Sequence, residues 1–343
     1  MSLASELSDA VRTAYVGLNK RLLDIDHAAA YLLLNRARFD KKTGDQIQFD
    51  IRYKRDLGGW YVPYDEFNTT REERIKKGLV DWKNAYVNVG IDGPTFAQNT
   101  GLSLASVIDK TSLSDLGGEK TEVLVNLLGD QMDSAIEDLK DIIGRAVYLD
   151  GSGDNGKAID GFQNIIENNT SSYAGRAVGD LGVSPRDGSN WWASYVATNS
   201  GTNRPLDLDL LATTIGDLWR GGRNRAEDLI GFMDHDLFNT LSLTVQGQQR
   251  FDSPALAEIG FKAIRWNMVD FVADENCPAN KIYLINLQNM WMQIHPAVNF
   301  TFTGFKEFPK VDAIAGQILA MLNLVCNDRH RQGLIGDVAS IIN

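Results

Sequence analysis

One loop of this 343-residue chain carries the residue types and spacing that could bind a nucleotide. The segment Gly151–Lys157 has the sequence Gly-Ser-Gly-Asp-Asn-Gly-Lys, so that Gly151, Gly153 and Gly156 fit the pattern G-x-G-x-x-G. In that pattern, backbone N–H groups of a glycine turn face a phosphate at the start of a helix. The same segment matches most of a Walker A motif. One hypothesis is therefore an enzyme that binds ATP or a dinucleotide through Gly151–Lys157.

The element before this loop argues for a simpler interpretation. Both nucleotide motifs require a strand before the glycines, but Glu119–Leu149 has apolar residues at the three-and-four spacing of one long amphipathic helix. A glycine tract after a helix is an ordinary C-terminal cap and turn. Ala158 stands where Walker A needs Ser or Thr, and Gly161 stands where a calcium loop needs Glu. We interpret the loop as a turn. The expected buried stripe of the helix is Leu124, Leu127, Leu128, Ala135, Ile136, Leu139, Ile142, Ile143, Ala146 and Leu149.

The remaining chemistry-bearing residues do not form a catalytic pattern. None of the four histidines lies in an H-E-x-x-H motif, and Cys277 and Cys326 lack partners at metal-ligand spacing. Asp234-His235-Asp236 is better explained as a helix start, because acidic residues there cap free N–H groups. The sequence therefore predicts no catalytic residue, no cofactor and no metal site.

A short basic loop is a candidate contact with another protein. Its sequence is Arg220-Gly-Gly-Arg-Asn-Arg225, so Arg220, Arg223 and Arg225 could bind phosphate or the carboxylates of a neighbouring subunit. Because the chain as a whole is acidic, we expect a protein contact.

The charge distribution limits the classes of partner. The net charge of −11 argues against a protein that coats nucleic acid with its own basic surface. Residues 119–220 hold 16 acidic and 8 basic side chains, which predicts one acidic face that repels DNA; the alternative is a solvated face kept charged for solubility. There is no run of eighteen apolar residues and no signal-peptide pattern at the start, so we expect no membrane association.

An alternating segment near the N-terminus predicts a β-ribbon. Ile47, Phe49, Ile51 and Tyr53 alternate with polar residues, and a second extended run covers Leu79–Ile91. Because a two-stranded ribbon is marginal alone, we expect this one to lie on a neighbouring subunit; the alternative is a ribbon folded back on its own domain. The residues predicted to contact the neighbour are Trp60, Tyr61, Tyr64, Phe67, Arg71 and Arg74.

The other predicted elements alternate between helix and strand. Residues 3–34 have helical spacing and could form an arm. Helix Leu206–Trp219, strand Asp228–Met233 and helix Asp236–Gln246 suggest a small α/β domain. The last third of the chain turns to β structure, with strands Lys262–Met268, Lys281–Ile285, Trp291–His295, Asn299–Phe305 and Gln317–Cys326.

This order of elements, with the helix exit Leu149–Gly156 and the late segment Gln317–Gly336, resembles the major capsid proteins of tailed bacteriophages, which have the Hong Kong ninety-seven type fold. The resemblance implies an α+β fold with a long spine helix, and it implies four parts. These are an N-terminal arm (1–39), an extended β-hairpin loop (40–95), a peripheral β domain with the spine helix (96–150 and 262–338) and an axial α/β domain (151–261).

The resemblance also implies a function. Such a protein self-assembles as hexamers and pentamers into the icosahedral shell that encloses phage DNA, which it touches only non-specifically. Its location is the virion capsid, assembled in the bacterial host cytoplasm, with a portal protein and a decoration protein as partners. Many relatives carry a scaffolding segment before the arm, and this chain begins almost at the arm, so we expect a separate scaffolding protein; the alternative is that the scaffolding segment was removed. The alternatives are a bacterial nanocompartment shell around a cargo enzyme and a tail or baseplate protein.

Overall fold

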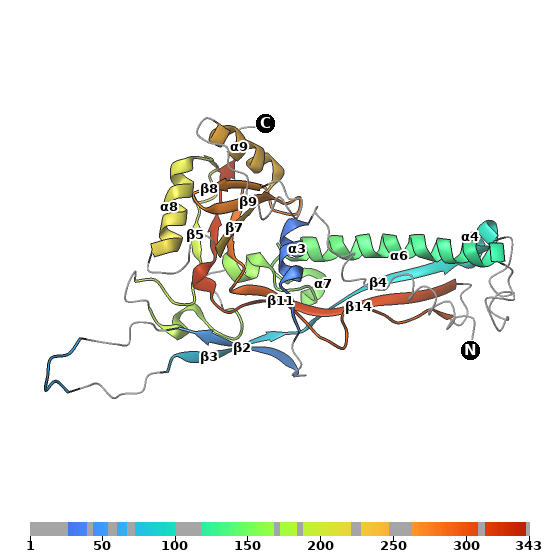
Figure 1. Ribbon diagram of the computed structural model, residues 1–343, viewed down its shortest axis with the longest axis horizontal. Helices are drawn as coiled ribbons and strands as arrows, with labels where there is room; N and C mark the ends of the chain where they lie inside the picture. The colour runs from blue at the N-terminus through green and yellow to red at the C-terminus, as the bar shows by residue number, and fades with distance from the viewer. Residues whose placement is uncertain are drawn as a thin grey trace.

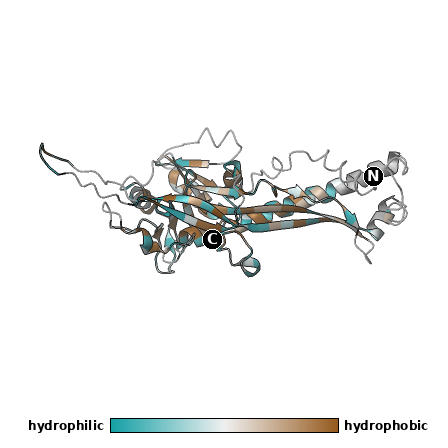
Figure 2. Ribbon diagram, turned by 90° about the horizontal axis from the view of Figure 1, so that it is seen from below, coloured by the Kyte–Doolittle hydropathy of each residue, from teal (hydrophilic) through white to brown (hydrophobic). Residues whose placement is uncertain are grey.

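The computed structural model describes residues 27–39, 44–53, 60–66, 73–100, 118–167, 172–183, 188–220, 228–246, 263–307 and 313–340. The molecule is elongated: one long helix and two long strands extend to one end, a hairpin projects at the other, and a compact α/β unit lies between them (Figure 1). Apolar residues are concentrated along the strands in the body (Figure 2). The α+β class predicted from the sequence is confirmed.

The predicted long helix is present as α6, Gly118–Ala146. Met132, Ala135, Ile136, Leu139 and Ile143 are buried at the expected spacing. Two members of the predicted stripe are not part of it, because Ile142 is 47% and Leu149 is 46% exposed. The helix ends at Ala146, three residues earlier than predicted, and the following turn buries Val147 and Tyr148 in place of Leu149.

A six-stranded sheet, here called the peripheral sheet, lies beside α6. Its strands are β1 (Arg38–Phe39), β4 (Lys83–Asp92), β11 (Met290–Ile294), β12 (Thr301–Phe302), β13 (Lys306–Glu307) and β14 (Ala313–Cys326). β14 pairs antiparallel with β4 over ten residues and also pairs with β11, β12 and β13. The predicted strand Gln317–Cys326 is therefore the second part of the central strand, and only Thr301–Phe302 of the predicted strand Asn299–Phe305 is paired.

A second six-stranded sheet, the axial sheet, forms the compact α/β unit. Its order is β5-β15-β10-β7-β9-β8, where β5 is Tyr195–Ala197, β15 Gly333–Ile335, β10 Ile282–Asn286, β7 Leu229–Met233, β9 Val269–Ala273 and β8 Ala263–Trp266. Helices α8 (Leu208–Trp219) and α9 (His235–Gln246) pack on this sheet, with Leu211, Ile215, Phe238 and Leu241 in a common apolar core. The predicted helix, strand and helix are present in this unit as α8, β7 and α9, and α9 begins directly after Asp234 as expected.

The remaining elements are short. They are α3 (Ala28–Asn35), α4 (Gly93–Thr100), α7 (Gly153–Gly156), a π-helical turn at Gln163–Glu167, 3-10 turns at Val178–Leu181 and Arg329–Arg331, and the small pair β6 (Arg204–Pro205) with β16 (Val338–Ala339). The N-terminus of α3 is fixed to the body because the buried Asp274 carboxylate accepts the Ala29 N–H at 2.8 Å. Burial raises the pKa of Asp274, partly offset by such hydrogen bonds. Most of the predicted helical segment 3–34 lies outside the described residues. Among the described helices, none is both long and apolar enough to cross a bilayer.

Candidate inter-subunit surfaces

The predicted two-stranded ribbon is shorter than expected, because its second strand changes partner at the root of the hairpin. β2 (Gln46–Arg52) pairs antiparallel with β3 (Ile75–Asp81), but β4 begins at Lys83 and pairs with β14 instead. The extended run Leu79–Ile91, predicted as one strand, is therefore divided at Trp82 between two sheets. The Trp82 indole N–H donates to the Gly44 carbonyl at 3.2 Å, which ties this division point to the start of the ribbon.

The root of the ribbon packs on its own chain. The apolar face of β2, including Ile47, Phe49 and Ile51, is buried, and the Phe49 ring meets Trp291 edge-on at 6.3 Å. The outer edge of β3 is also occupied, since the Leu79 N–H donates to the Ala174 carbonyl at 3.1 Å. The expectation that the ribbon needs a neighbouring subunit is therefore wrong for its root, where the alternative of a ribbon folded back on its own domain applies.

The tip of the hairpin has no such cover from the described residues. Residues 60–66, here called the hairpin tip, project at the far end of the molecule from α4 (Figure 1). Trp60 and Tyr64 are each 105% exposed. The tip is a defined turn, because the Asp65 carboxylate accepts the Val62 N–H at 2.7 Å and the Asp65 N–H donates to the Val62 carbonyl at 3.0 Å. A fixed turn presents its aromatic side chains at little entropic cost on binding.

The other predicted contact residues lie apart from the tip. Arg74 is exposed where the ribbon begins to separate, and its carbonyl accepts the Tyr53 N–H at 3.1 Å. Arg220 follows α8 on the axial unit, where its guanidinium pairs with Asp217 at 3.2 Å. The structure therefore places these residues in separate regions rather than in one site. Phe67, Arg71, Arg223 and Arg225 lie outside the described residues.

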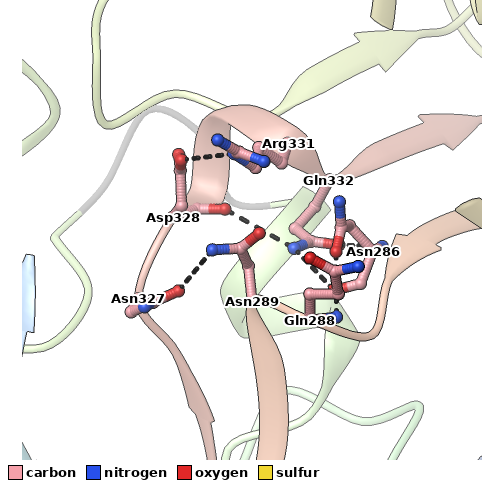
Figure 3. Close-up of polar contacts among 7 residues, drawn as sticks. All are labelled: Asn286, Gln288, Asn289, Asn327, Asp328, Arg331 and Gln332. Atoms are coloured by element: carbon pink, nitrogen blue, oxygen red, sulfur yellow. Dashed lines mark hydrogen bonds and ion pairs between the residues drawn. The ribbon is translucent and has the colours of Figure 1, made fainter. Parts of the chain in front are cut away.

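A cluster of amide side chains joins the two sheets at the place where the chain passes between them twice. The turn after β10 leads to β11, and the turn after β14 leads to β15, so both turns connect the axial sheet to the peripheral sheet. The Asn289 amide donates to the Asn327 side-chain oxygen at 2.9 Å, while the Asn327 N–H donates to the Asn289 carbonyl at 3.1 Å (Figure 3).

The buried part of this amide cluster is centred on Gln332, which is 0% exposed. Its side-chain oxygen accepts the Asn286 N–H at 2.8 Å, and its NH₂ group donates to the Asn286 carbonyl at 3.4 Å and to the Asp328 carbonyl at 3.5 Å (Figure 3). Arg331 pairs with the Asp328 carboxylate at 2.8 Å in the same turn. Buried amides whose groups are satisfied in this way fix geometry, so the cluster sets how the two sheets meet.

The glycine loop after α6 is closed by its own side chains. Asp150 accepts hydrogen bonds from the Ser152 N–H at 2.9 Å and the Ser152 hydroxyl at 2.6 Å, and these bonds lower the pKa of Asp150. Asp154 and Asn155 have positive φ values of 52° and 59°. The Gly156 carbonyl accepts from the Lys83 ammonium at 2.6 Å. The prediction that this loop follows a helix and forms a turn is confirmed.

One face of α6 is acidic, as the charge distribution predicted. Asp130, Asp133, Glu137 and Asp138 are exposed on the side opposite the buried stripe. Asp141, next along the same face, pairs with Arg145 at 3.0 Å and with His27 at 3.1 Å.

A groove lies between the ribbon root and the peripheral sheet, and the sequence did not predict it. We call it the basic groove; its volume is about 550 Å³, and it is lined by Arg38, Phe39, Ile47, Gln48, Phe49, Asp50, Arg52, Trp291, Gln293 and Asn327. The Arg38 guanidinium lies 3.7 Å from the centroid of the Trp291 ring, and the partial burial of Arg38 lowers its pKa. β1 holds Arg38 in place, but it is two residues long and pairs with β11, more than 250 positions away. No local sequence pattern could therefore predict the groove.

Comparison with known proteins agrees with the fold. The family model of the SU10 major capsid protein matches residues 119–339. A cyanophage A-1(L) capsid protein is 18% identical, with 92% of this chain and 93% of that chain covered at a TM-score of 0.63. The capsid protein of a native GTA particle (12% identity, 90% and 91% covered, TM-score 0.56) and the SrpI encapsulin of Synechococcus elongatus (10% identity, 90% and 88% covered, TM-score 0.52) share the fold. No curated protein matches the sequence.

The resemblance to the major capsid proteins of tailed bacteriophages that the sequence suggested is confirmed. Because the family model covers more than half of the residues, the chain belongs to the SU10 major capsid protein family.

Proposed function

We propose that this major capsid protein assembles as hexamers and pentamers into a closed icosahedral shell that encloses phage DNA. The observation that carries this proposal is the hairpin tip, where Trp60 and Tyr64 are fully exposed on a turn held by Asp65. Large apolar side chains on a preformed turn are typical anchors of a protein interface. Contact with a neighbouring copy would cover them, and repeated contacts of this kind stabilise a closed assembly by multivalency.

The proposal divides the chain into working parts. Residues 1–39 are the arm, the β2–β3 ribbon with its tip is the extended hairpin, and α6 with the peripheral sheet forms the peripheral domain. The axial domain includes α8, α9 and all strands of the axial sheet; the pairing of β10 with β7 and β15 supports assigning 263–286 and 333–335 to it rather than to the peripheral domain. We propose assembly in the host cytoplasm with a separate scaffolding protein, a portal protein and a decoration protein, and no enzymatic role.

The acidic face of α6 suits an inner wall. Asp130, Asp133, Glu137 and Asp138 present carboxylates along one side of the helix. DNA binding in general depends on cations that neutralise phosphates. An acidic inner surface would therefore keep a packaged genome from adhering to the shell.

The hairpin tip provides the direct test of this proposal. Alanine at both Trp60 and Tyr61 is expected to leave folded subunits but to reduce particle yield at least about tenfold, because interface anchors each contribute roughly 1–2 kcal/mol or more. Deleting 57–70 should abolish particles. Sedimentation and negative-stain microscopy of the purified full chain measure the yield.

Met268 to alanine is the matched control, since this exposed side chain (58%) lies on the axial unit, away from the tip. Its yield should remain normal. Normal shells from the Trp60/Tyr61 double variant or from the deletion would refute a role of the tip in assembly. Shells that hold a protein cargo and no DNA would favour the nanocompartment function instead.

A further inference from the structure

The basic groove has an unbalanced charge and an open surface. Arg38 and Arg52 line it, and within the described part of the chain neither pairs with a carboxylate. The one acidic lining residue, Asp50, is already paired with Lys77 at 2.6 Å. Phe39 is 52% exposed at the edge of the groove. Among the described residues, the groove therefore offers two cations without a carboxylate partner beside a half-exposed aromatic ring.

The floor of the groove is rigid. The Trp291 ring is 5% exposed, its indole N–H donates to the Gln293 side-chain oxygen at 3.0 Å, and the Arg38 guanidinium lies over its face. One face of that guanidinium is covered by Trp291, so an aromatic ring from outside could stack on the other face.

The hairpin tip has the opposite character. Within residues 60–66 the only charged side chains are Asp65 and Glu66, and both are exposed. They adjoin Trp60, Tyr61 and Tyr64, which supply apolar area. The tip is therefore an acidic aromatic knob, complementary to the groove in both charge and chemistry.

We propose that the hairpin tip of one copy docks into the basic groove of the next copy, with Asp65 and Glu66 facing Arg38 and Arg52. This inference rests on the proposed shell function and names the surface that receives the tip. Since the tip and the groove lie at different places on one chain, the contact is heterologous: each copy donates one tip and accepts another, and the contact propagates head to tail until a ring closes.

A second groove on the same molecule is the competing receptor. It has a volume of about 410 Å³ on the outer face of β4 and β14 and is lined by Asn84, Ala85, Tyr86, Val298, Gln317, Leu319 and Ala320. No lining residue is charged, so it offers nothing to the carboxylates of the tip. For this reason the basic groove is the favoured site.

Cysteine cross-linking in assembled particles distinguishes the two receptors. One full-length variant carries Val62→Cys with Gln48→Cys, which places thiols on the tip and in the basic groove. A matched variant carries Val62→Cys with Tyr86→Cys, which places the second thiol in the competing groove. The native Cys277 and Cys326 are buried and should not react. A short bismaleimide is added to the particles, and the products are separated on a denaturing gel.

The first variant is expected to give a ladder that extends past the dimer, and a mixture of the two single variants (Val62→Cys and Gln48→Cys) should give dimers only. A ladder from the Tyr86 variant without one from the Gln48 variant would overturn the inference while leaving the shell function intact. Products that stop at the dimer in the first variant would exclude head-to-tail docking. Failure of the unmodified chain to form particles would count against the proposed function itself.

Charge at the tip provides an independent measurement. Glu66→Arg is expected to lower particle yield about fivefold or more at low salt, because a like charge then faces the two arginines; Glu66→Gln should fall between this variant and the native chain. Equal yields for all three would contradict the electrostatic pairing.

Discussion

Replacing Asn323 with aspartate is expected to reduce the free energy of unfolding by about 3 kcal/mol, because a buried donor group is exchanged for a second carboxylate. Asn323 is 0% exposed on β14. Its NH₂ group donates to the Asp81 carbonyl at 2.7 Å and to the Asp160 carboxylate at 2.9 Å. An aspartate has no NH₂ group, so two oxygens that now accept hydrogen bonds would face a carboxylate instead.

The other half of the Asn323 side chain explains why the effect extends beyond one contact. Its oxygen accepts the Asp160 N–H at 2.9 Å and the Leu324 N–H at 2.8 Å. Asp81 is the last residue of β3 and Asp160 follows the glycine loop, so one amide joins the hairpin root and the spine exit to the central strand. Loss of this link should make the orientation of the hairpin less fixed as well as destabilise the fold. We therefore expect a lower particle yield as well.

Denaturant unfolding of the unassembled subunit, followed by tryptophan fluorescence, measures this change. Asn88→Asp is the matched control, since Asn88 is exposed on β4 and its side-chain oxygen accepts from Gln317 at 3.1 Å, a role that a carboxylate can also fill. The control should change stability by no more than about 0.5 kcal/mol. Equal stability of the Asn323 and Asn88 variants would show that the buried amide is not a structural link.

Local sequence pattern was sufficient to predict several of the buried elements. The helices α6 and α8 and the strands β7 and β11 lie within three residues of their predicted bounds, because the helices have apolar residues at helical spacing and the strands are short, mostly apolar runs. Ile142 was wrongly predicted to be buried, because residue spacing alone does not give the width of the buried face of a helix. In α6 the buried face includes Ile143 but not Ile142.

Pairing partners could not be predicted in the same way. The run Leu79–Ile91 was predicted as one extended segment, yet the strand changes partner at Trp82, from β2 to β14, which is more than 200 residues further along the chain. The packing of the ribbon root on its own chain was missed for the same reason, because Phe49 packs against Trp291, which is also more than 200 residues away in the sequence.

The hairpin tip, the basic groove and the amide cluster differ in the same way in how far the sequence could predict them. The aromatic tip could be predicted, because Trp60, Tyr61 and Tyr64 lie together in a short polar excursion. The basic groove and the amide cluster could not, because each brings together residues from distant turns. Asn289 and Asn327 separately resemble ordinary turn residues, and only the fold makes them partners.

Gly161→Ala is expected to destabilise the subunit by about 3 kcal/mol, through overpacking against backbone atoms. A Cβ at this position would lie 2.3 Å from the Leu149 carbonyl oxygen, 2.5 Å from that of Ala146 and 2.6 Å from that of Val147. These carbonyls end α6 and cannot move aside as a flexible side chain can. The Phe162 N–H donates to the Val147 carbonyl at 2.7 Å, so displacement of the segment would also break this hydrogen bond.

Gly153→Ala is the matched control within the same loop, because its Cβ would meet only the Ala158 Cβ at 3.4 Å, an ordinary contact. We expect the control to be neutral or more stable by up to about 1 kcal/mol, and thermal unfolding of both variants measures the difference. Gly161→Glu would supply the glutamate that a calcium loop requires, yet it should be at least as damaging as Gly161→Ala. If either Gly161 variant were as stable as the Gly153 variant, close packing on the end of α6 would not be the reason for glycine. If both Gly161 variants are destabilised as expected, Gly161, which departs from the calcium-loop pattern, is the residue that allows the spine helix and the following loop to pack together.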